Sequence, residues 1–180
     1  CVPKKGDLCA AKFSDGEWYR AKVEKVQGNQ VHLLYIDYGN KELSDSTRLG
    51  VLPATYQSLS AQATKYAFAC IALPPDEDDA HLAVDTLYQE ILNKECLLNV
   101  EYRGAGIDYV SLLYADSKED IAQSLVAEGM LLVENRKEKR LAKLLGNYLK
   151  AQDKAKTARL NLWRYGDFTE DDAKEFGYQR

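Results

Sequence analysis

The sequence has few of the residues that form metal sites or disulfide frameworks. Its 180 residues include four cysteines and two histidines, and no two cysteines form a Cys-x-x-Cys pair. Zinc sites need about four such ligands at short spacings, so we expect no metal and no cofactor. Cys9, Cys70 and Cys96 lie in apolar, strand-like runs. We expect them to be buried free thiols, which is typical of a reducing, intracellular compartment.

Long hydrophobic runs are also missing. None approaches the roughly 18 apolar residues that a membrane-spanning helix needs, and the N-terminus shows no signal peptide. We therefore expect no membrane partner. The chain begins at Cys1 rather than at methionine, which indicates a fragment of a longer protein. Its 46% apolar and 29% charged residues are ordinary for a globular protein, and its length suits one large domain or two small ones.

Positive charge is scarce over most of the chain and concentrated near its end. The net charge is −4, but residues 136–164 carry ten lysines and arginines against two acids. Residues 1–135 carry 12 basic and 21 acidic residues. A basic segment on an acidic body can bind anions locally despite the low overall pI.

The first third of the chain reads as a small antiparallel sheet. Apolar, β-branched and aromatic residues fill the segments 8–13, 18–26 and 31–38, and a fourth strand can start near residue 41. Turn residues such as Ser14-Asp15-Gly16 separate these segments. About five short strands with tight turns and no helix predict a small, strongly bent barrel.

The remainder mixes strands and helices. Pro53 interrupts the pattern, and we expect a connector with a short helix over residues 56–64. A strand over 66–73, a helix capped by the acids of 76–79, a hairpin and two further helices should follow. The first of these helices should turn Val84, Leu87, Tyr88 and Ile91 inward; the hairpin should pair 96–102 with 107–114, and the last helices should span 120–128 and 138–161.

Aromatic residues gather around one predicted turn. The segment Tyr35–Asn40 (YIDYGN) places two tyrosines and an amide at a strand end, and Phe13 and Tyr19 flank the preceding turn. Strand aromatics usually pack inward, which makes them barrel core by periodicity alone. Clustered aromatic faces can instead hold a flat, weakly hydrated organic cation. That interpretation requires a bend near Asp37, because an unbroken strand points the two tyrosines to opposite faces.

Motifs in both halves resemble a known family. Phe13-x5-Tyr19 followed by YIDYGN resembles a Tudor domain of the methylarginine-reading type. The second half is similar to a staphylococcal-nuclease-like OB-fold through Tyr114-Ala115-Asp116, Gly129 and the run from Ala155 to Trp163. Together they resemble the extended Tudor region of the multidomain staphylococcal-nuclease and Tudor proteins.

The resemblance implies a mostly β fold with helices, of the α+β class. It comprises a five-stranded Tudor barrel over residues 1–55, a helical connector over 56–64 and a degenerate staphylococcal-nuclease-like OB-fold over 65–180. In that family the barrel is inserted within the nuclease-like fold. The first strands of the second domain are therefore expected to precede this chain.

The resemblance also implies a ligand, which is symmetric dimethylarginine in an Arg-Gly-type peptide. The partners would be methylated proteins of RNA metabolism, such as Sm or Piwi-type proteins. The role would be a cytoplasmic and nuclear scaffold in RNA processing, splicing, silencing and transcription assemblies. Trp18 stays a core residue, and Asp37 is a structural hydrogen-bond partner. The implied aromatic cage consists of Phe13, Tyr19, Tyr35, Tyr38 and the hydrogen-bonding amide Asn40.

An enzyme is the competing class of function. The calcium-dependent phosphodiesterase chemistry of the nuclease family needs carboxylates for the metal and arginines for the phosphate. The family's second catalytic arginine precedes the Tyr-Ala-Asp motif by six positions, where this chain has Asp108. Arg103 lies nearby but on the other side of the predicted hairpin loop. We therefore expect no catalytic residues and no enzymatic activity.

The basic C-terminal helix allows two interpretations. Such a run is usually a solvated face, but it could also contact the phosphate backbone of RNA. The helix carries no aromatic ladder, so base-specific recognition is not expected. An RNA-binding module is the alternative function, with candidate RNA contacts at Lys139, Arg140, Lys143, Lys150 and Lys154.

Overall fold

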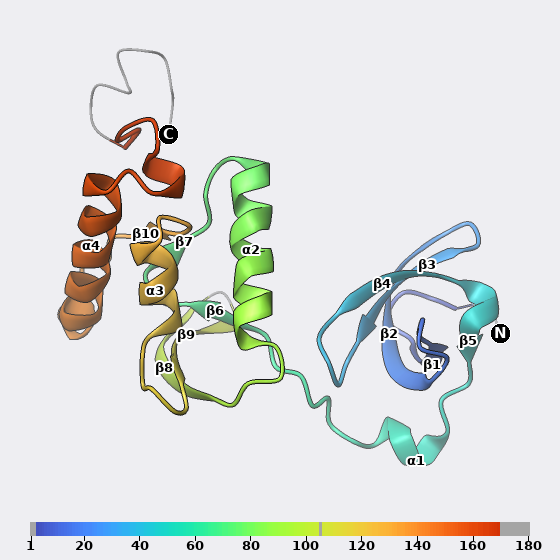
Figure 1. The fold of residues 1–180 in the computed structure, drawn as a ribbon. Coiled ribbons are helices and arrows are strands. Elements are labelled where there is room, and N and C mark those ends of the chain that lie inside the picture. The colour runs from blue at the N-terminus through green and yellow to red at the C-terminus, as the bar shows by residue number, and fades with distance from the viewer. Residues whose placement is uncertain (1–2, 105, 170–180) are drawn as a thin grey trace. The chain divides into compact units, whose positions relative to one another are not determined.

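The computed structural model describes residues 3–104 and 106–169, and the chain divides into two units after Lys65 (Figure 1). The first unit holds one five-stranded antiparallel sheet, and the second mixes helices with two small sheets. The predicted α+β class is confirmed. In the described part of the chain, no helix is both long and apolar enough to cross a membrane.

The sheet of the first unit curls strongly around its own core (Figure 1). A register shift between Val23 and Lys25 breaks the pairing of the second and third strands, and such bulges bend a strand and increase its twist. The strand order is β4-β3-β2-β1-β5. The strands are β1 (Leu8–Lys12), β2 (Trp18–Gln27), β3 (Gln30–Tyr35), β4 (Lys41–Asp45) and β5 (Leu49–Gly50), with a 3-10 turn, η1 (Ser46–Arg48), before β5.

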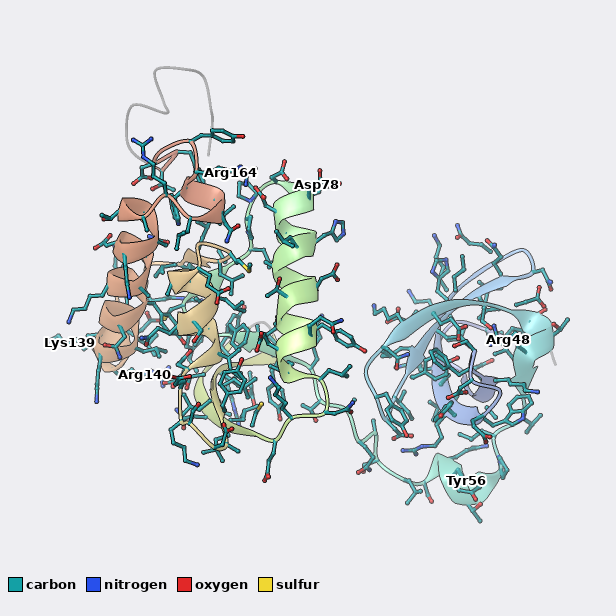
Figure 2. The ribbon with its side chains drawn as sticks, in the orientation of Figure 1. Arg48, Tyr56, Asp78, Lys139, Arg140 and Arg164 are labelled. Atoms are coloured by element: carbon teal, nitrogen blue, oxygen red, sulfur yellow. The ribbon has the colours of Figure 1, made fainter. Side chains whose placement is uncertain are left out.

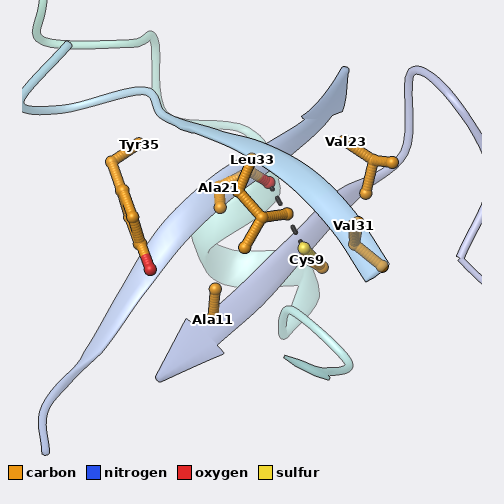
Figure 3. Packing of buried hydrophobic residues seen from close by; sticks show 7 residues of the cluster. All are labelled: Cys9, Ala11, Ala21, Val23, Val31, Leu33 and Tyr35. Atoms are coloured by element: carbon orange, nitrogen blue, oxygen red, sulfur yellow. Dashed lines mark hydrogen bonds between the residues drawn. The ribbon is translucent and has the colours of Figure 1, made fainter. Parts of the chain in front are cut away.

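Alternating residues of β1, β2 and β3 form the core of this unit (Figure 3). Side chains of a strand point to opposite faces in turn, so every second residue faces inward. The Cys9 thiol contacts the Ala21 carbonyl oxygen at 3.6 Å, and burial raises the pKa of this thiol. Cys9 and Cys70 are buried free thiols as predicted, whereas Cys96 is half-buried. The core residues are Cys9, Ala11, Ala21, Val23, Val31, Leu33 and Tyr35.

The connector forms less helix than the sequence predicts. The helix α1 spans only Ala54–Gln57, directly after Pro53. The chain beyond it is irregular, because its carbonyl groups accept hydrogen bonds from the Arg20 side chain of β2 instead of continuing a helical ladder. This contact draws the connector onto the first unit.

The second unit contains the predicted hairpin and helices. β8 (Cys96–Gly104) and β9 (Ile107–Tyr114) pair antiparallel, and Ala105 between them lies outside the described residues. The predicted strand over 66–73 is two short strands, because Cys70 adopts a positive φ of 57° and redirects the chain from one sheet to the other. These strands are β6 (Tyr66–Phe68), which pairs with β9, and β7 (Ile71–Ala72), which pairs with β10 (Leu132–Val133).

The helices of this unit begin at acidic caps. α2 (Glu77–Ile91) begins after Asp76, and α3 (Ile121–Ala127) begins after Asp120; both carboxylates accept backbone N–H groups. The inward face of α2 differs from the predicted one: Leu87 and Ile91 pack against the core with Ala83, whereas Val84 and Tyr88 are exposed. The two exposed positions lie about 100° around the helix from Ala83 and Leu87, because each residue turns the helix by that angle.

The last helix is shorter than predicted. α4 spans Ala142–Thr157 and follows a 3-10 turn, η2 (Lys139–Leu141). It packs its buried side against α3 and β10. A final 3-10 turn, η3 (Asn161–Trp163), returns to the end of α3, where the Leu162 amide donates to the Gly129 carbonyl at 3.1 Å.

Candidate functional site

The chain reverses direction immediately after β3. The amides of Tyr38 and Gly39 both donate to the Tyr35 carbonyl, at 3.2 and 2.7 Å, and the Tyr35 amide donates to the Asn40 carbonyl at 2.9 Å. Gly39 has a φ of 85°, which side chains other than glycine rarely adopt. The bend that a shared pocket requires is therefore present, and Tyr38 folds back beside the strand that it follows.

Four aromatic rings of this region form one cluster centred on Tyr19. Its ring centroid lies 5.3 Å from Tyr38, 6.1 Å from Tyr35 and 6.2 Å from Phe13. Phe13 and Tyr35 lie 5.3 Å apart. All four pairs are perpendicular to within about 5°, with interplanar angles from 85° to 89°. Edge-to-face packing of this kind fixes each ring against its neighbour.

The cluster runs from the core of the unit to its surface. Tyr35 is 1% exposed and belongs to the hydrophobic core, whereas Tyr38 is 70% exposed. Phe13 and Tyr19 are half-buried, and Asn40 is exposed at the end of the same turn. Burial thus places Tyr35 at the base and Tyr38 at the rim. Both interpretations of the sequence hold in part, since one tyrosine is core and the other is free to meet a ligand.

Trp18 is not a core residue, contrary to prediction. Its side chain is 53% exposed and lies over Gly50, where a Cβ atom would come within 3.4 Å of the ring. Trp18 is the first residue of β2 and pairs with the last residue of β1, so it lies at the end of the sheet where the core is open to solvent.

Asp15 orients the central ring of the cluster. The Tyr19 hydroxyl donates to Asp15 Oδ2 at 2.8 Å, and this bond raises the pKa of Tyr19. Asp15 lies in the turn between β1 and β2 and also accepts the Glu17 amide at 2.9 Å. Sequence reasoning missed this residue. The signal was an acid four positions before a tyrosine across a tight turn.

Arg20 holds the cage turn from behind, and sequence reasoning missed it too. Its Nε and Nη2 atoms donate to Asp37 at 2.8 and 2.5 Å. The remaining donors reach the carbonyls of Tyr56, Leu59 and Ser60 at 2.7–2.9 Å. Five N–H donors thus meet five acceptors, which is the full capacity of a guanidinium group. Asp37 also accepts the Gln62 amide, so it has the structural role predicted for it.

We expect Arg20→Lys to destabilise the first unit by about 2 kcal/mol, because an ammonium group cannot reproduce the bidentate contact or the fan of donors. Amide exchange at Ala63, whose N–H bonds to the Ile36 carbonyl, should accelerate as the connector detaches. Lys22→Ala, an exposed change on the same strand, is the control. Unchanged exchange in the lysine variant would show that the connector is held by other contacts.

Stability of this unit should also fall in acid. The hydrogen bonds from Arg20 hold the pKa of Asp37 below its usual value. A carboxylate whose folded pKa is lowered stabilises the fold above its unfolded pKa and ceases to do so as pH falls through the folded value. We expect denaturation midpoints of the chain to drop below about pH 4. Asp37→Asn should be less stable at neutral pH and should lose less on acidification.

A second ion pair supports the buried base of the cluster. The Tyr35 hydroxyl donates to Glu42, whose other oxygen pairs with Arg48 at 3.2 Å. Burial, followed by this hydrogen bond, raises the pKa of Tyr35. Arg48 in turn donates to the Lys12 carbonyl at the end of β1. The network fixes the ring of Tyr35 from behind and leaves the outer rings free.

The residues weighed for catalysis pair with each other. Arg103 and Asp108 face one another across the β8–β9 hairpin, with Nε and Oδ1 3.1 Å apart. Among the described residues, His, Cys, Asp and Glu side chains form no group of three or more that could hold a metal ion. The arrangement offers an ion pair at the position where phosphodiester chemistry would need a free arginine.

A separate pocket of about 720 Å³ lies in the second unit, between the end of α2 and α3. Carboxylates such as Glu90, Glu119 and Glu128 line it, and Tyr114 is its one aromatic lining residue. The Tyr114 hydroxyl bonds to Glu90 at 2.9 Å. A single ring cannot enclose a cation, so the aromatic cluster of the first unit remains the better candidate site.

Both halves of the chain match known families. Residues 2–69 match the Tudor domain family, and residues 74–165 match the family of staphylococcal nuclease homologues. The staphylococcal nuclease domain-containing protein 1 of Drosophila melanogaster is 46% identical over 177 residues, which cover 97% of this chain and 19% of that protein. The chain spans about a fifth of the length of the curated relatives it matches.

Two solved structures share this architecture. The extended Tudor domain of Drosophila melanogaster Tudor-SN (p100) matches with a TM-score of 0.83 at 44% identity, over 91% of this chain and 77% of that one. The extended Tudor domain of human TDRD1 matches with a TM-score of 0.62 at 26% identity, over 74% of this chain and 68% of that one. The second structure is a complex with a symmetrically dimethylated peptide.

Proposed function

Because the chain belongs to the extended Tudor family, in which a Tudor domain is joined to a staphylococcal nuclease-like domain, we propose that it reads methylated arginine. The ligand is symmetric dimethylarginine in an Arg-Gly-type peptide. The cage consists of Phe13, Tyr19, Tyr38 and Asn40 with Tyr35 at its base. The observation that carries this proposal is the perpendicular pair of Tyr19 and Tyr38, 5.3 Å apart, which extends from the core to a largely exposed ring.

Cation–π attraction supplies the affinity. Each ring contributes roughly 0.5–1 kcal/mol at an exposed site and about 2 kcal/mol or more where water is excluded. Methylation removes N–H donors and hydration from a guanidinium, so its transfer to an aromatic cage costs less. After the cost of ordering the peptide, three or four rings support dissociation constants in the micromolar range. Asn40 can accept a remaining N–H through its side-chain oxygen.

The second domain of this chain acts without catalysis. Asp108 stands where a catalytic arginine would be needed, and Arg103 is engaged in an ion pair with it. The chain then serves as a scaffold that connects methylated partners, of Sm or Piwi type, to RNA-processing and transcription assemblies of the cytoplasm and nucleus. The symmetrically dimethylated peptide bound by the TDRD1 neighbour supports this class of partner.

Calorimetry with one Arg-Gly peptide in four states tests the proposal. The states are unmodified, monomethylated, asymmetrically dimethylated and symmetrically dimethylated arginine. We expect the symmetric form to bind in the micromolar range and the unmodified form to bind at least tenfold more weakly, since its hydrated guanidinium gains less from aromatic faces. Equal affinity for all four states would contradict a methylarginine reader. A metal-dependent nuclease assay on the same protein tests the absence of catalysis, and robust activity that is lost in Arg103→Ala would contradict it.

A further inference from the structure

The ten basic residues of 136–164 fall mainly into two groups in the structure. Three of them are neutralised by nearby carboxylates: Arg136 by Glu134 and Glu138, Lys156 by Asp167, and Arg164 by Asp79. Among the described residues, five others on η2 and α4 have no ion-pair partner and are exposed. These five define the α4 stripe: Lys139, Arg140, Lys143, Lys150 and Lys154.

The stripe occupies the outer side of its helix. Each residue advances an α-helix by about 100°, so Lys143, Lys150 and Lys154 lie within about 40° of one another around the axis. Tyr148 and Ala155, on the opposite side, are buried in the core of the unit. Lys139 and Arg140 extend the stripe from the preceding 3-10 turn, at the start of α4 in Figure 2. At 1.5 Å per residue the whole stripe is roughly 22 Å long.

Helix stability does not explain this arrangement. Lys150 and Lys154 form a like-charge pair at a spacing of four residues, which destabilises a helix. On α2 the comparable exposed Lys94 pairs with Glu90 at the favourable spacing instead. Asp153 is the one acid within α4, and it lies toward the edge of the stripe. A row of unneutralised cations is thus maintained at some cost to the helix.

We propose that the α4 stripe binds the phosphate backbone of nucleic acid without reading its bases. Nucleic acid presents a continuous row of negative charges, one per 1.7 Å of a duplex, and lysines that neutralise them release condensed counterions. Sequence-tolerant binding of single strands adds aromatic side chains on which bases stack. Tyr148 is the one aromatic residue of α4 and it is buried, so the stripe has charge alone to offer.

Binding of a short RNA duplex and of its separate strand, followed by fluorescence anisotropy between about 50 and 200 mM salt, tests this proposal. Five phosphate contacts on a duplex predict a slope of log K against log salt of about −4.5, or roughly a 500-fold loss of affinity over that range. A sequence-scrambled duplex should bind equally well. Absence of any shift at low salt would overturn the proposal.

A triple variant locates the surface. Lys143→Gln, Lys150→Gln and Lys154→Gln together should reduce the slope by about 3, since each lost phosphate contact removes roughly one unit. The matched control replaces three exposed lysines of the first unit, Lys5, Lys22 and Lys25, by glutamine, with the same change in net charge. We expect the control to keep the wild-type slope. An equal loss in both variants would mean general charge attraction and would overturn the assignment to α4.

Two further measurements separate this proposal from other outcomes. Glutamine and lysine have similar helix propensities, so the triple variant should melt at the wild-type temperature and bind dimethylarginine peptide unchanged. Binding to anionic phosphatidylserine vesicles at salt concentrations where the RNA duplex does not bind would assign the stripe to a membrane surface and overturn the proposal. The methylarginine proposal does not depend on either result.

Discussion

Tyr38→Ala should abolish measurable binding of a symmetrically dimethylated peptide. The Tyr38 ring is the exposed wall of the cluster, 70% accessible and 5.3 Å from Tyr19. Its removal deletes one cation–π contact and opens the site to water, which weakens the remaining contacts. A loss of about 2 kcal/mol corresponds to roughly thirtyfold, which moves micromolar binding out of the range of ordinary calorimetry.

Two companion variants show what the ring supplies. Tyr38→Phe keeps the π face and should keep most of the affinity, whereas a hydrogen-bonding role for the hydroxyl would make it as weak as alanine. Tyr56→Ala removes another exposed tyrosine of the same unit, on α1 (Figure 2), and should bind normally. Because Tyr38 is mostly exposed, the alanine variant should unfold at nearly the wild-type midpoint. Wild-type affinity in Tyr38→Ala would show that the ligand binds elsewhere.

Gly129→Ala should destabilise the second unit by about 3 kcal/mol or more. Gly129 ends α3 with a φ of 72°, and a Cβ atom there would stand 2.5 Å from the Leu160 carbonyl oxygen and 3.0 Å from Trp163. The left-handed backbone alone costs a residue with a side chain about 1–2 kcal/mol. The steric overlap adds to this by pushing η3 from its place, and with it the fully buried Trp163.

Gly106→Ala is the matched control for this prediction. Gly106 has nearly the same φ, 76°, but nothing lies within 4 Å of its hypothetical Cβ atom. It therefore measures the backbone strain without the overlap, and we expect a loss of about 1 kcal/mol. Urea denaturation in a Trp18→Phe background, where Trp163 is the remaining tryptophan, reports on the second unit. Similar midpoints for the two variants would show that η3 yields without cost. Binding of methylated peptide should survive in both variants.

The sequence predicted those features that depend on neighbours along the chain. The period of two in β1, β2 and β3 gave the core of the first unit, and Asp76 and Asp120 gave the starts of α2 and α3. Gly39 marked the turn that carries Tyr38. Each of these signals is local, because a strand face, a helix cap or a tight turn is set by residues within a few positions.

Predictions failed where distant residues compete for the same groups. The connector helix stops at Gln57 because Arg20, 36 or more residues earlier, takes the carbonyls beyond it. Trp18 has the composition of a core residue but lies at the open end of the sheet, where no element covers it in the described chain. On α2, Tyr88 fits an inward face by spacing, and the position of the sheet selects Leu87 instead.

The sequence by itself determined the two units, the positions of the four aromatic residues and the excess of positive charge at the end of the chain. Tertiary structure decided which of those residues face solvent. Tyr35 and Tyr38 have the same chemistry, yet one is 1% and the other 70% exposed, because the turn at Gly39 leaves one in the core and returns the other to the surface. Likewise, folding pairs Arg136, Lys156 and Arg164 with carboxylates and leaves the α4 stripe unpaired. Side-chain identity is encoded locally, whereas exposure and charge neutralisation depend on what the rest of the chain brings within a few ångströms.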